Sequence, residues 1–348
     1  MLKQITSNTA FNSISRLLLI VMTILAVGLV SGCGSSDKAE KHVELIFSHS
    51  PARWQEGAES MVKTLQADGY VANLQVFDSD DKQRQAMQAA IEAKPACIVL
   101  AGGNDEIIAD ELKKAKEADI PIIAYDSMVK NTDAISYFVT FDNEGVGESM
   151  GRYIEEKFNL QSGAGPFTIE FLSGSEHDSN ARLMHDGAYK ILKPYIDKGQ
   201  LVNISGKASF EETAVKDWNP DNAKSMLQAI VAKNYNGRNL DIVVAASDGI
   251  AYGAIEALSA YNGSWPFITG QDADKKALEY VRNGRMGFTI QKDSATLNYK
   301  CLRMIKAVVE GSKPDINDVK TYNNGVITIP AYLCIPRIID KENIDSIK

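Results

Sequence analysis

Cysteine is scarce in this sequence, with four in 348 residues. None of Cys33, Cys97, Cys301 and Cys334 stands in the C-x-x-C spacing of zinc and redox motifs, so no metal site is predicted. Cys97 lies in the apolar run 96–100 and is interpreted as a core residue. Cys301 and Cys334 could pair in an oxidising compartment, but their spacing alone does not establish a disulfide.

A membrane-spanning run is also lacking near the N-terminus. The apolar stretch there, residues 17–30, has about fourteen residues, whereas a spanning helix needs roughly 20. The first 32 residues include Lys3 and Arg16 but no acidic residue. This pattern is typical of an export signal and makes a transmembrane anchor the weaker interpretation.

The export signal ends at a cysteine. The sequence Val30-Ser31-Gly32-Cys33 resembles the lipobox of bacterial lipoproteins, which implies that residues 1–32 are removed and that Cys33 carries a lipid. The alternative is a plain secretory signal. Residues 33–41 are small and polar, as in a flexible tether, so the fold should begin near His42. The protein is therefore expected on the outer face of the cytoplasmic membrane or in the periplasm.

Excess positive charge is absent as well. The formal charge is −8, and removing residues 1–32 takes away two positive charges and leaves −10. Such a chain repels phosphate backbones, so nucleic acid is not an expected partner.

The remaining 300 or so residues exceed one usual core and favour two domains. Strands are predicted at 43–47, 72–77, 96–101 and 120–125, and helices at 54–67, 83–93 and 105–118. A second series has strands at 167–172, 201–205, 242–246, 267–269 and 287–290, and helices at 180–196, 220–232, 250–260 and 275–282. Asp248 has the position of a helix cap. The alternation predicts two doubly wound α/β domains with parallel sheets.

Polar and aromatic residues follow several predicted strands. In open parallel sheets the ligand site lies beyond the carboxyl ends of the strands. Each polar residue taken alone is better explained as a helix cap or a solvated loop residue, but together they suggest one site. A tryptophan at the start of a helix can stack on the apolar face of a sugar ring. The candidates are Trp54, Asp126, Asp178, Asn180, Trp218, Asp272 and Lys292.

Six motifs, spread over both halves, resemble the periplasmic sugar-binding proteins of ABC importers. The similarity covers about 43–345 and is greatest to the xylose-binding and multiple-sugar-binding members of the ribose, galactose and xylose type. The motifs are Arg53-Trp54-Gln55, Ala124-Tyr125-Asp126, Phe141-Asp142-Asn143-Glu144-Gly145-Val146-Gly147, Asp178-Ser179-Asn180-Ala181, Thr269-Gly270-Gln271-Asp272-Ala273-Asp274 and Tyr322-Asn323-Asn324-Gly325-Val326.

The resemblance implies a type I periplasmic binding protein, with two lobes joined by a three-segment hinge. One lobe would be 42–141 plus 293–325 and the other 142–292 plus 326–348, with crossings near 141–142, 292–293 and 325–329. Its implied partners are a monosaccharide and ABC importer permease subunits, with a chemoreceptor left open. It implies a monomer without a cofactor. The implied sugar contacts are Arg53, Trp54, Asp126, Asp178, Asn180, Trp218, Asp272 and Lys292.

Two positions depart from the family pattern. Ser127 stands where the family usually has arginine, and Ser247 where it often has asparagine. Both changes remove a multidentate hydrogen-bonding group and leave space for a larger ligand or bridging waters. The sugar is therefore left open among the xylose, glucose, galactose and arabinose class.

Four other functions use a similar fold or chemistry. A repressor would need a basic helix-turn-helix at its N-terminus. A sugar hydrolase would need a pair of carboxylates about 5–9.5 Å apart, and no G-x-S-x-G motif or metal triad accompanies the candidates. A receptor that passes a sugar-like signal to a sensor is the main alternative. A nucleoside-binding lipoprotein is the fourth.

Overall fold

A computed structural model describes residues 41–49 and 52–346, without the side chains of Ala52, Arg53 and Ser346. The chain divides into residues 1–41 and residues 42–348, and only the second unit is described below. The export signal, Cys33 and nearly all of the tether lie outside the described residues. Within the described ranges, no helix has the length and apolar character needed to cross a membrane.

The first sheet has six parallel strands in the order β11-β5-β4-β3-β1-β2. Their order follows from successive strand–helix–strand units, since β1 pairs with both β2 and β3 and places Leu45 opposite Leu74 and Val99. The strands are β1 (His42–Ser48), β2 (Val71–Phe77), β3 (Cys97–Ala101), β4 (Ile122–Tyr125), β5 (Ile135–Phe141) and β11 (Ala331–Cys334).

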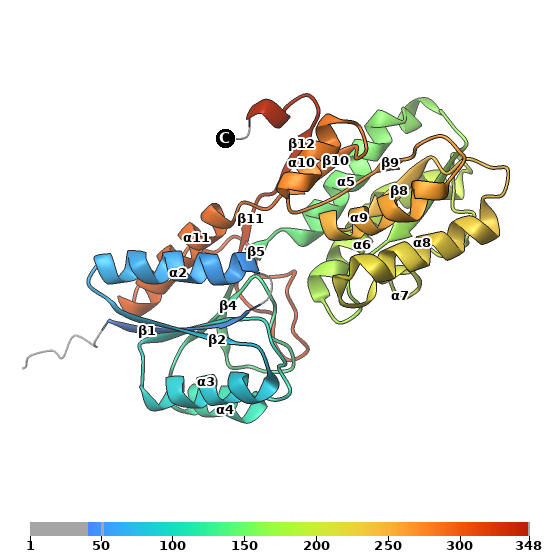
Figure 1. Ribbon diagram of the computed structural model, residues 1–348. Coiled ribbons are helices and arrows are strands. Elements are labelled where there is room, and N and C mark those ends of the chain that lie inside the picture. Colours follow the sequence, from blue (N-terminus) through green and yellow to red (C-terminus); the bar gives the residue numbers. More distant parts are fainter. Residues whose placement is uncertain (1–40, 50–51, 347–348) are drawn as a thin grey trace, which may run out of the picture. The chain divides into compact units, whose positions relative to one another are not determined.

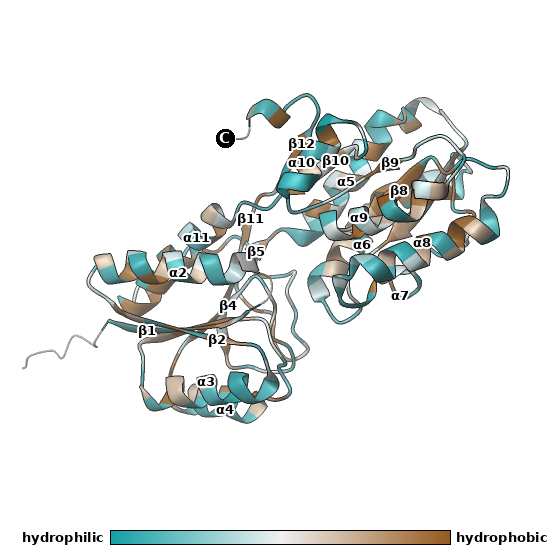
Figure 2. Cartoon of the chain, viewed as in Figure 1, coloured by the Kyte–Doolittle hydropathy of each residue, from teal (hydrophilic) through white to brown (hydrophobic). Residues whose placement is uncertain are grey.

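Helices cover both faces of this sheet (Figure 1). Val43, Leu45 and Phe47 of β1 pack in a core with α2 (Ala52–Ala67) and α11 (Ser294–Val309). Ile46 points the other way, into a core with α3 (Asp80–Glu92) and α4 (Ala109–Glu117). Since both faces are buried, the interior of β1, residues 43–47, is apolar apart from Glu44. Figure 2 shows these strands as hydrophobic between helices with hydrophilic outer faces.

The second sheet has four parallel strands in the order β7-β6-β8-β9. Beside it, β10 and β12 form a two-stranded antiparallel sheet. The strands are β6 (Phe167–Leu172), β7 (Leu201–Val202), β8 (Ile242–Ala245), β9 (Phe267–Ile268), β10 (Phe288–Gln291) and β12 (Arg337–Asp340). The helices are α5 (Asn143–Lys157), α6 (Ser179–Asp197), α7 (Phe210–Thr213), α8 (Pro220–Asn234), α9 (Asp248–Ala257) and α10 (Lys275–Arg282), with short 3-10 turns η1 (Leu160–Ser162), η2 (Lys216–Trp218), η3 (Leu258–Ala260) and η4 (Ile344–Ser346).

The predicted α/β class with flanked parallel sheets is confirmed. The strand pairing places one of the three crossings between the lobes at a different point from the one the sequence predicts. The third crossing was expected near 325–329, but β11 pairs with β5 in the first sheet and β12 pairs with β10. The chain therefore changes sheets between Cys334 and Arg337, and with that revision the division into two lobes stays a prediction.

Asp248 is not the cap of α9, contrary to the prediction. Ser247 is the cap, and its hydroxyl oxygen accepts the N–H of Ile250 at 3.2 Å. Asp248 is the first helical residue and is fully buried, with its carboxylate turned to the loop after β9.

Cys97, Cys301 and Cys334 are free and buried in the core beneath α2 and α11. Burial raises the pKa of the Cys334 thiol to about 11, because the thiolate would lose its solvation there. All three thiols therefore pack as small apolar groups in this structure.

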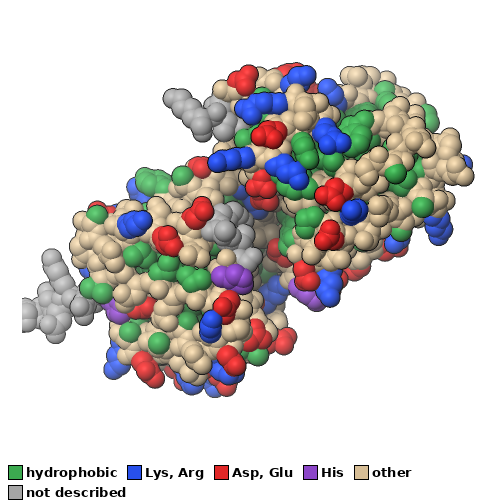
Figure 3. Space-filling view, viewed as in Figure 1, with side chains coloured by type: hydrophobic (Ala, Val, Ile, Leu, Met, Phe, Trp, Pro, Cys, Tyr) green, Lys and Arg blue, Asp and Glu red, His purple; other side chains and the backbone are tan. Residues whose placement is uncertain are grey.

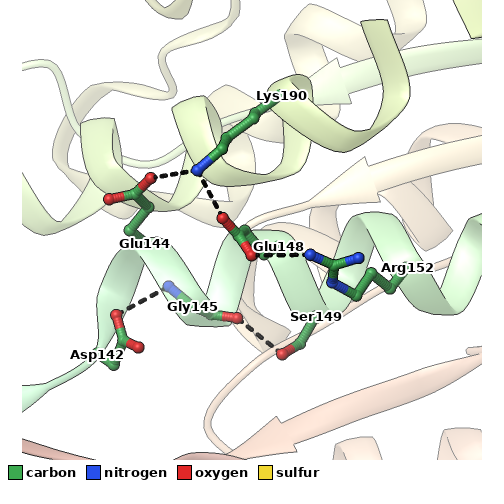
Figure 4. A network of polar contacts seen from close by, with 7 residues as sticks. All are labelled: Asp142, Glu144, Gly145, Glu148, Ser149, Arg152 and Lys190. Atoms are coloured by element: carbon green, nitrogen blue, oxygen red, sulfur yellow. Dashed lines mark hydrogen bonds and ion pairs between the residues drawn. The ribbon is translucent and has the colours of Figure 1, made fainter. Parts of the chain in front are cut away.

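Helices α5 and α6 touch along their backbones. A Cβ on Gly147 would lie 2.0 Å from the Met184 carbonyl oxygen, and one on Gly187 would lie 2.3 Å from the Glu144 carbonyl oxygen. Lys190 of α6 bridges Glu144 and Glu148 of α5 at 3.0 and 2.7 Å on the exposed side of this contact (Figure 4). Because α6 begins at the candidate site, this contact fixes the site's position against α5.

Gly147→Ala should destabilise the protein, because its Cβ cannot fit against a main-chain carbonyl. The expected loss is about 1–3 kcal/mol, as for overpacked cores. The matched control is Gly249→Ala in α9, where the nearest atom to the new Cβ lies at 3.8 Å and a small gain is expected. Thermal melting of both variants checks this, and equal melting temperatures would show that α5 and α6 can separate without cost.

Candidate functional site

A cavity of about 380 Å³ lies at the carboxyl ends of strands from both larger sheets. This volume is in the usual range for small-molecule pockets. Seven of the eight sequence-predicted residues line it, and the side chain of the eighth, Arg53, lies outside the described residues. The lining residues are Trp54, Asp126, Ser127, Asp178, Asn180, Met184, Asp217, Trp218, Ser247, Gln271, Asp272 and Lys292.

Most of the lining loops follow a strand, as expected at the carboxyl ends of parallel strands. The exception is the turn Lys216–Trp218, which follows α7. Asp126 follows β4, Asp178 and Asn180 follow β6, Asp272 follows β9, and Lys292 follows β10. The residues are far apart in sequence, but all these strands end at the same cavity. The fold therefore brings together the residues that the sequence singled out.

Trp54 and Asp126 form a pair on the first sheet. The Trp54 indole Nε1 donates to Asp126 Oδ2 at 2.8 Å. Asp126 is 2% exposed and has a left-handed backbone, with φ of 58°. The Thr140 hydroxyl lies 3.4 Å from Asp126 Oδ1, and Asn180 Nδ2 donates to the Asp126 carbonyl at 2.7 Å. The carboxylate is thus held in place before any ligand binds.

Trp218 and Asp178 form the corresponding pair beside the second sheet. The Trp218 indole Nε1 donates to Asp178 Oδ2 at 3.3 Å. Asp178 Oδ1 accepts the backbone N–H of Asn180 at 2.8 Å, so this carboxylate caps α6 while it faces the cavity. The Trp218 ring lies over Gly174, where a Cβ would come within 2.1 Å of it. The Trp218 ring can therefore pack here only because residue 174 has no side chain, and Trp218 also lines the cavity.

The charge balance of the lining is acidic. Asp126, Asp178, Asp217 and Asp272 supply carboxylates, and Lys292 is the one cation among the described lining side chains. Burial raises the pKa of Asp178, while the Asn180 N–H bond and the charge of Lys292 lower it. Many acceptors and few cations suit a ligand that donates hydrogen bonds and carries no negative charge.

Two acceptors in the lining have no partner among the described residues. Asn180 Oδ1 and Gln271 Oε1 are buried and make no hydrogen bond there. An unpaired buried acceptor is costly, so both atoms gain from a ligand hydroxyl or a water. Within the described part of the chain, no cluster of three or more His, Cys, Asp or Glu residues could hold a metal ion.

The sequence prediction did not include Met184, Asp217 and Gln271. Met184 lies four residues after Asn180 on α6, so helical spacing could have found it. Gln271 directly precedes Asp272 and is 2% exposed. No sequence pattern indicates Asp217. It lines the cavity because the backbone of the turn Lys216–Trp218 is left-handed at this residue, with φ of 56°, and such a turn is not evident from residue spacing.

An α/β architecture with a cavity at the strand ends, lined by paired tryptophan and aspartate residues, defines a solute-binding protein. The chain belongs to the periplasmic binding protein domain family, whose profile matches residues 47–313. Proteins of this family bind solutes for transport and are not enzymes.

Three similar proteins show the breadth of this match. The multiple sugar-binding periplasmic receptor ChvE of Rhizobium radiobacter is 34% identical over 302 residues, 85% of each chain. The D-xylose-binding periplasmic protein of Escherichia coli is 29% identical over 328 residues, 93% of this chain and 94% of that one. The ABC transporter solute-binding protein of Clostridium phytofermentans, solved with bound β-D-glucose, is 36% identical, with a TM-score of 0.81 and coverage of 88% and 95%.

Proposed function

We propose that the protein is an exported solute-binding protein that captures one monosaccharide and delivers it to an ABC importer. The observation that carries the proposal is the cavity between Trp54–Asp126 and Trp218–Asp178, which combines apolar ring faces with fixed carboxylates. A sugar ring presents C–H groups to aromatic faces and hydroxyls to carboxylates. The similar proteins named for sugars support the same class of ligand.

The ligand is a neutral aldose of the xylose, glucose, galactose or arabinose class. The acidic lining repels phosphorylated sugars and nucleotides, since Lys292 is the one cation among the described lining side chains. Ser127 and Ser247 both line the cavity, and neither fills the space of a long side chain. This leaves room for a hexose or for water around a pentose.

Binding proceeds by closure of two lobes around the sugar. Asp126 follows a strand of the first sheet and Asp178 follows a strand of the second, so one ligand that contacts both stabilises a closed form. The permease subunits then recognise that form. The same closure would serve a receptor that passes a sugar-like signal to a sensor, with a chemoreceptor as partner, and this stays the alternative.

The mature chain is attached to the membrane through a lipid on Cys33 and acts as a monomer. The support for the lipid is the sequence Val30-Ser31-Gly32-Cys33 after a short apolar segment. Among the residues drawn in colour, the face in Figure 3 shows acidic and basic side chains interspersed, without a broad basic patch for nucleic acid.

Asp272→Gly should weaken sugar binding at least about tenfold without lowering the melting temperature of the ligand-free protein. The carboxylate is a charged acceptor worth about 1.5–3 kcal/mol, and its backbone φ of 109° suits glycine. Thermal shift and calorimetry with D-xylose, L-arabinose, D-glucose and D-galactose measure this. A sugar at a hundred times its Kd should stabilise the parent by about 2.7 kcal/mol.

The matched control for this experiment is Glu279→Ala, an exposed carboxylate on α10 outside the cavity. It should bind like the parent. A parent that responds to nucleosides or to no sugar would contradict the proposed function. Normal affinity in Asp272→Gly would remove Asp272 from the site.

Saturating sugar should also reduce the radius of gyration in small-angle scattering, because closure brings the lobes together. Asp272→Gly is the control at a sugar concentration about three times the parent's Kd. That concentration fills about three quarters of the parent's sites but less than about a quarter of those of a variant at least tenfold weaker, so the variant's radius of gyration should stay near the ligand-free value. A sugar that binds tightly by calorimetry without any compaction would argue for a preformed pocket and against closure.

Cys33→Ser should release the full-length protein from the membrane fraction or leave it unprocessed, because the lipid would have no attachment point. Cys97→Ala is the control, since Cys97 is buried in the core and plays no part in anchoring. Fractionation and the mass of the mature N-terminus check both variants. Full membrane retention of a normally processed Cys33→Ser protein would exclude the lipid anchor.

A further inference from the structure

The turn that carries Asp272 has an unusual backbone. Asp272 has φ of 109° and the next residue, Ala273, has φ of 55°. Positive φ is uncommon for residues other than glycine, and it persists where the surrounding structure enforces it. One bond that does so joins the Asp272 N–H to the Ile290 carbonyl at 2.8 Å.

Two buried side chains behind the turn hold the next two N–H groups. The Ala273 N–H donates to Thr289 Oγ1 at 3.1 Å, and the Asp274 N–H donates to Asp248 Oδ2 at 2.9 Å. The Thr289 hydroxyl in turn donates to Asp248 Oδ1 at 2.7 Å. Both carboxylate oxygens of Asp248 are therefore engaged, and the three bonds form one connected brace.

The brace is built into the core. Asp248 and Thr289 are both fully buried. The Asp248 backbone N–H also donates to the Gln271 carbonyl at 2.8 Å. A Cβ on Gly270 would lie 2.4 Å from Asp248 Oδ1, so the side chain fits only beside a glycine. Burial, and then the charge of Asp272, raise the pKa of Asp248 well above its ordinary value.

We propose that Asp248 and Thr289 are positioning residues that hold Asp272 in its ligand-binding orientation. The inference rests on the proposed role of Asp272 in sugar binding. Neither side chain lines the cavity, so both act through the turn. A carboxylate fixed before binding loses less conformational freedom when the sugar arrives, which raises affinity.

A double-mutant cycle on sugar affinity tests the brace. Thr289→Val keeps the side-chain shape but removes the hydroxyl, so it should weaken binding of D-glucose and D-xylose by about fivefold or more. In the Asp272→Gly background the same change should weaken binding by less than about twofold, because no carboxylate remains to be positioned. In an Asp126→Ala background, where Asp272 is retained, Thr289→Val should weaken binding by the same factor as in the parent, about fivefold or more.

Two further measurements separate positioning from a general structural role. Thr289→Ser keeps the hydroxyl and should bind within about twofold of the parent. Hydrogen exchange at the Ala273 and Asp274 amides should be faster in ligand-free Thr289→Val than in Thr289→Ser. If Thr289→Val does not fold, Asp248→Asn, which cannot accept both bonds, takes its place in the cycle.

The outcomes distinguish this inference from the proposed function. Equal losses of affinity in the parent and Asp272→Gly backgrounds, or no loss in the parent, would overturn the brace while sugar binding stands. A parent that binds neither these sugars nor the other two in the panel would overturn the proposed function and the brace together. Loss confined to backgrounds that retain Asp272 would support the brace.

Discussion

The site depends on the parallel pairing of the strands. Parallel strands end at the same edge of their sheet, so the loops that follow β6 and β9 meet at one edge of the second sheet. The loop after β4 reaches the same cavity from the first sheet. The close α5–α6 contact at Gly147 and Gly187 then fixes α6, which Asp178 caps and which carries Asn180. Without this arrangement, the same residues would be scattered caps and loop residues.

Capping a helix and facing a ligand are compatible roles. From the sequence alone the two roles are alternatives for Asp178, but one carboxylate oxygen of Asp178 caps α6 and the other accepts the Trp218 N–H. A helix start offers N–H groups that need an acceptor, and the loop that supplies it already lies at the strand ends. Local folding and placement of the pocket therefore use the same side chain.

The sequence predicted most of the fold because apolar periodicity is local. The predicted strand 167–172 and helix 275–282 coincide with β6 and α10, and the predicted polar residues at the strand ends line the cavity. The prediction left out several elements, among them β5, α5 and α11. Other errors concern pairing across the structure. Residues 331–334 are apolar in either sheet, and only the contact with β5 assigns them. Asp248 is of a residue type that commonly caps helices, so the sequence predicts a cap. Its actual partners, Thr289 and Asp274, are distant in sequence and could not be predicted locally.

The unpaired acceptors indicate what completes the structure. Among the described residues, Asn180 uses its Nδ2 on the Asp126 carbonyl and its buried Oδ1 has no hydrogen-bond partner, and Gln271 Oε1 is in the same state. Buried acceptors of this kind destabilise a protein until a donor arrives. An anionic ligand brings acceptors of its own, whereas each hydroxyl of a sugar can donate one bond and accept others. A sugar hydroxyl can therefore satisfy the acceptors that would otherwise need a water, whereas an anionic group cannot, and this favours a neutral polyol.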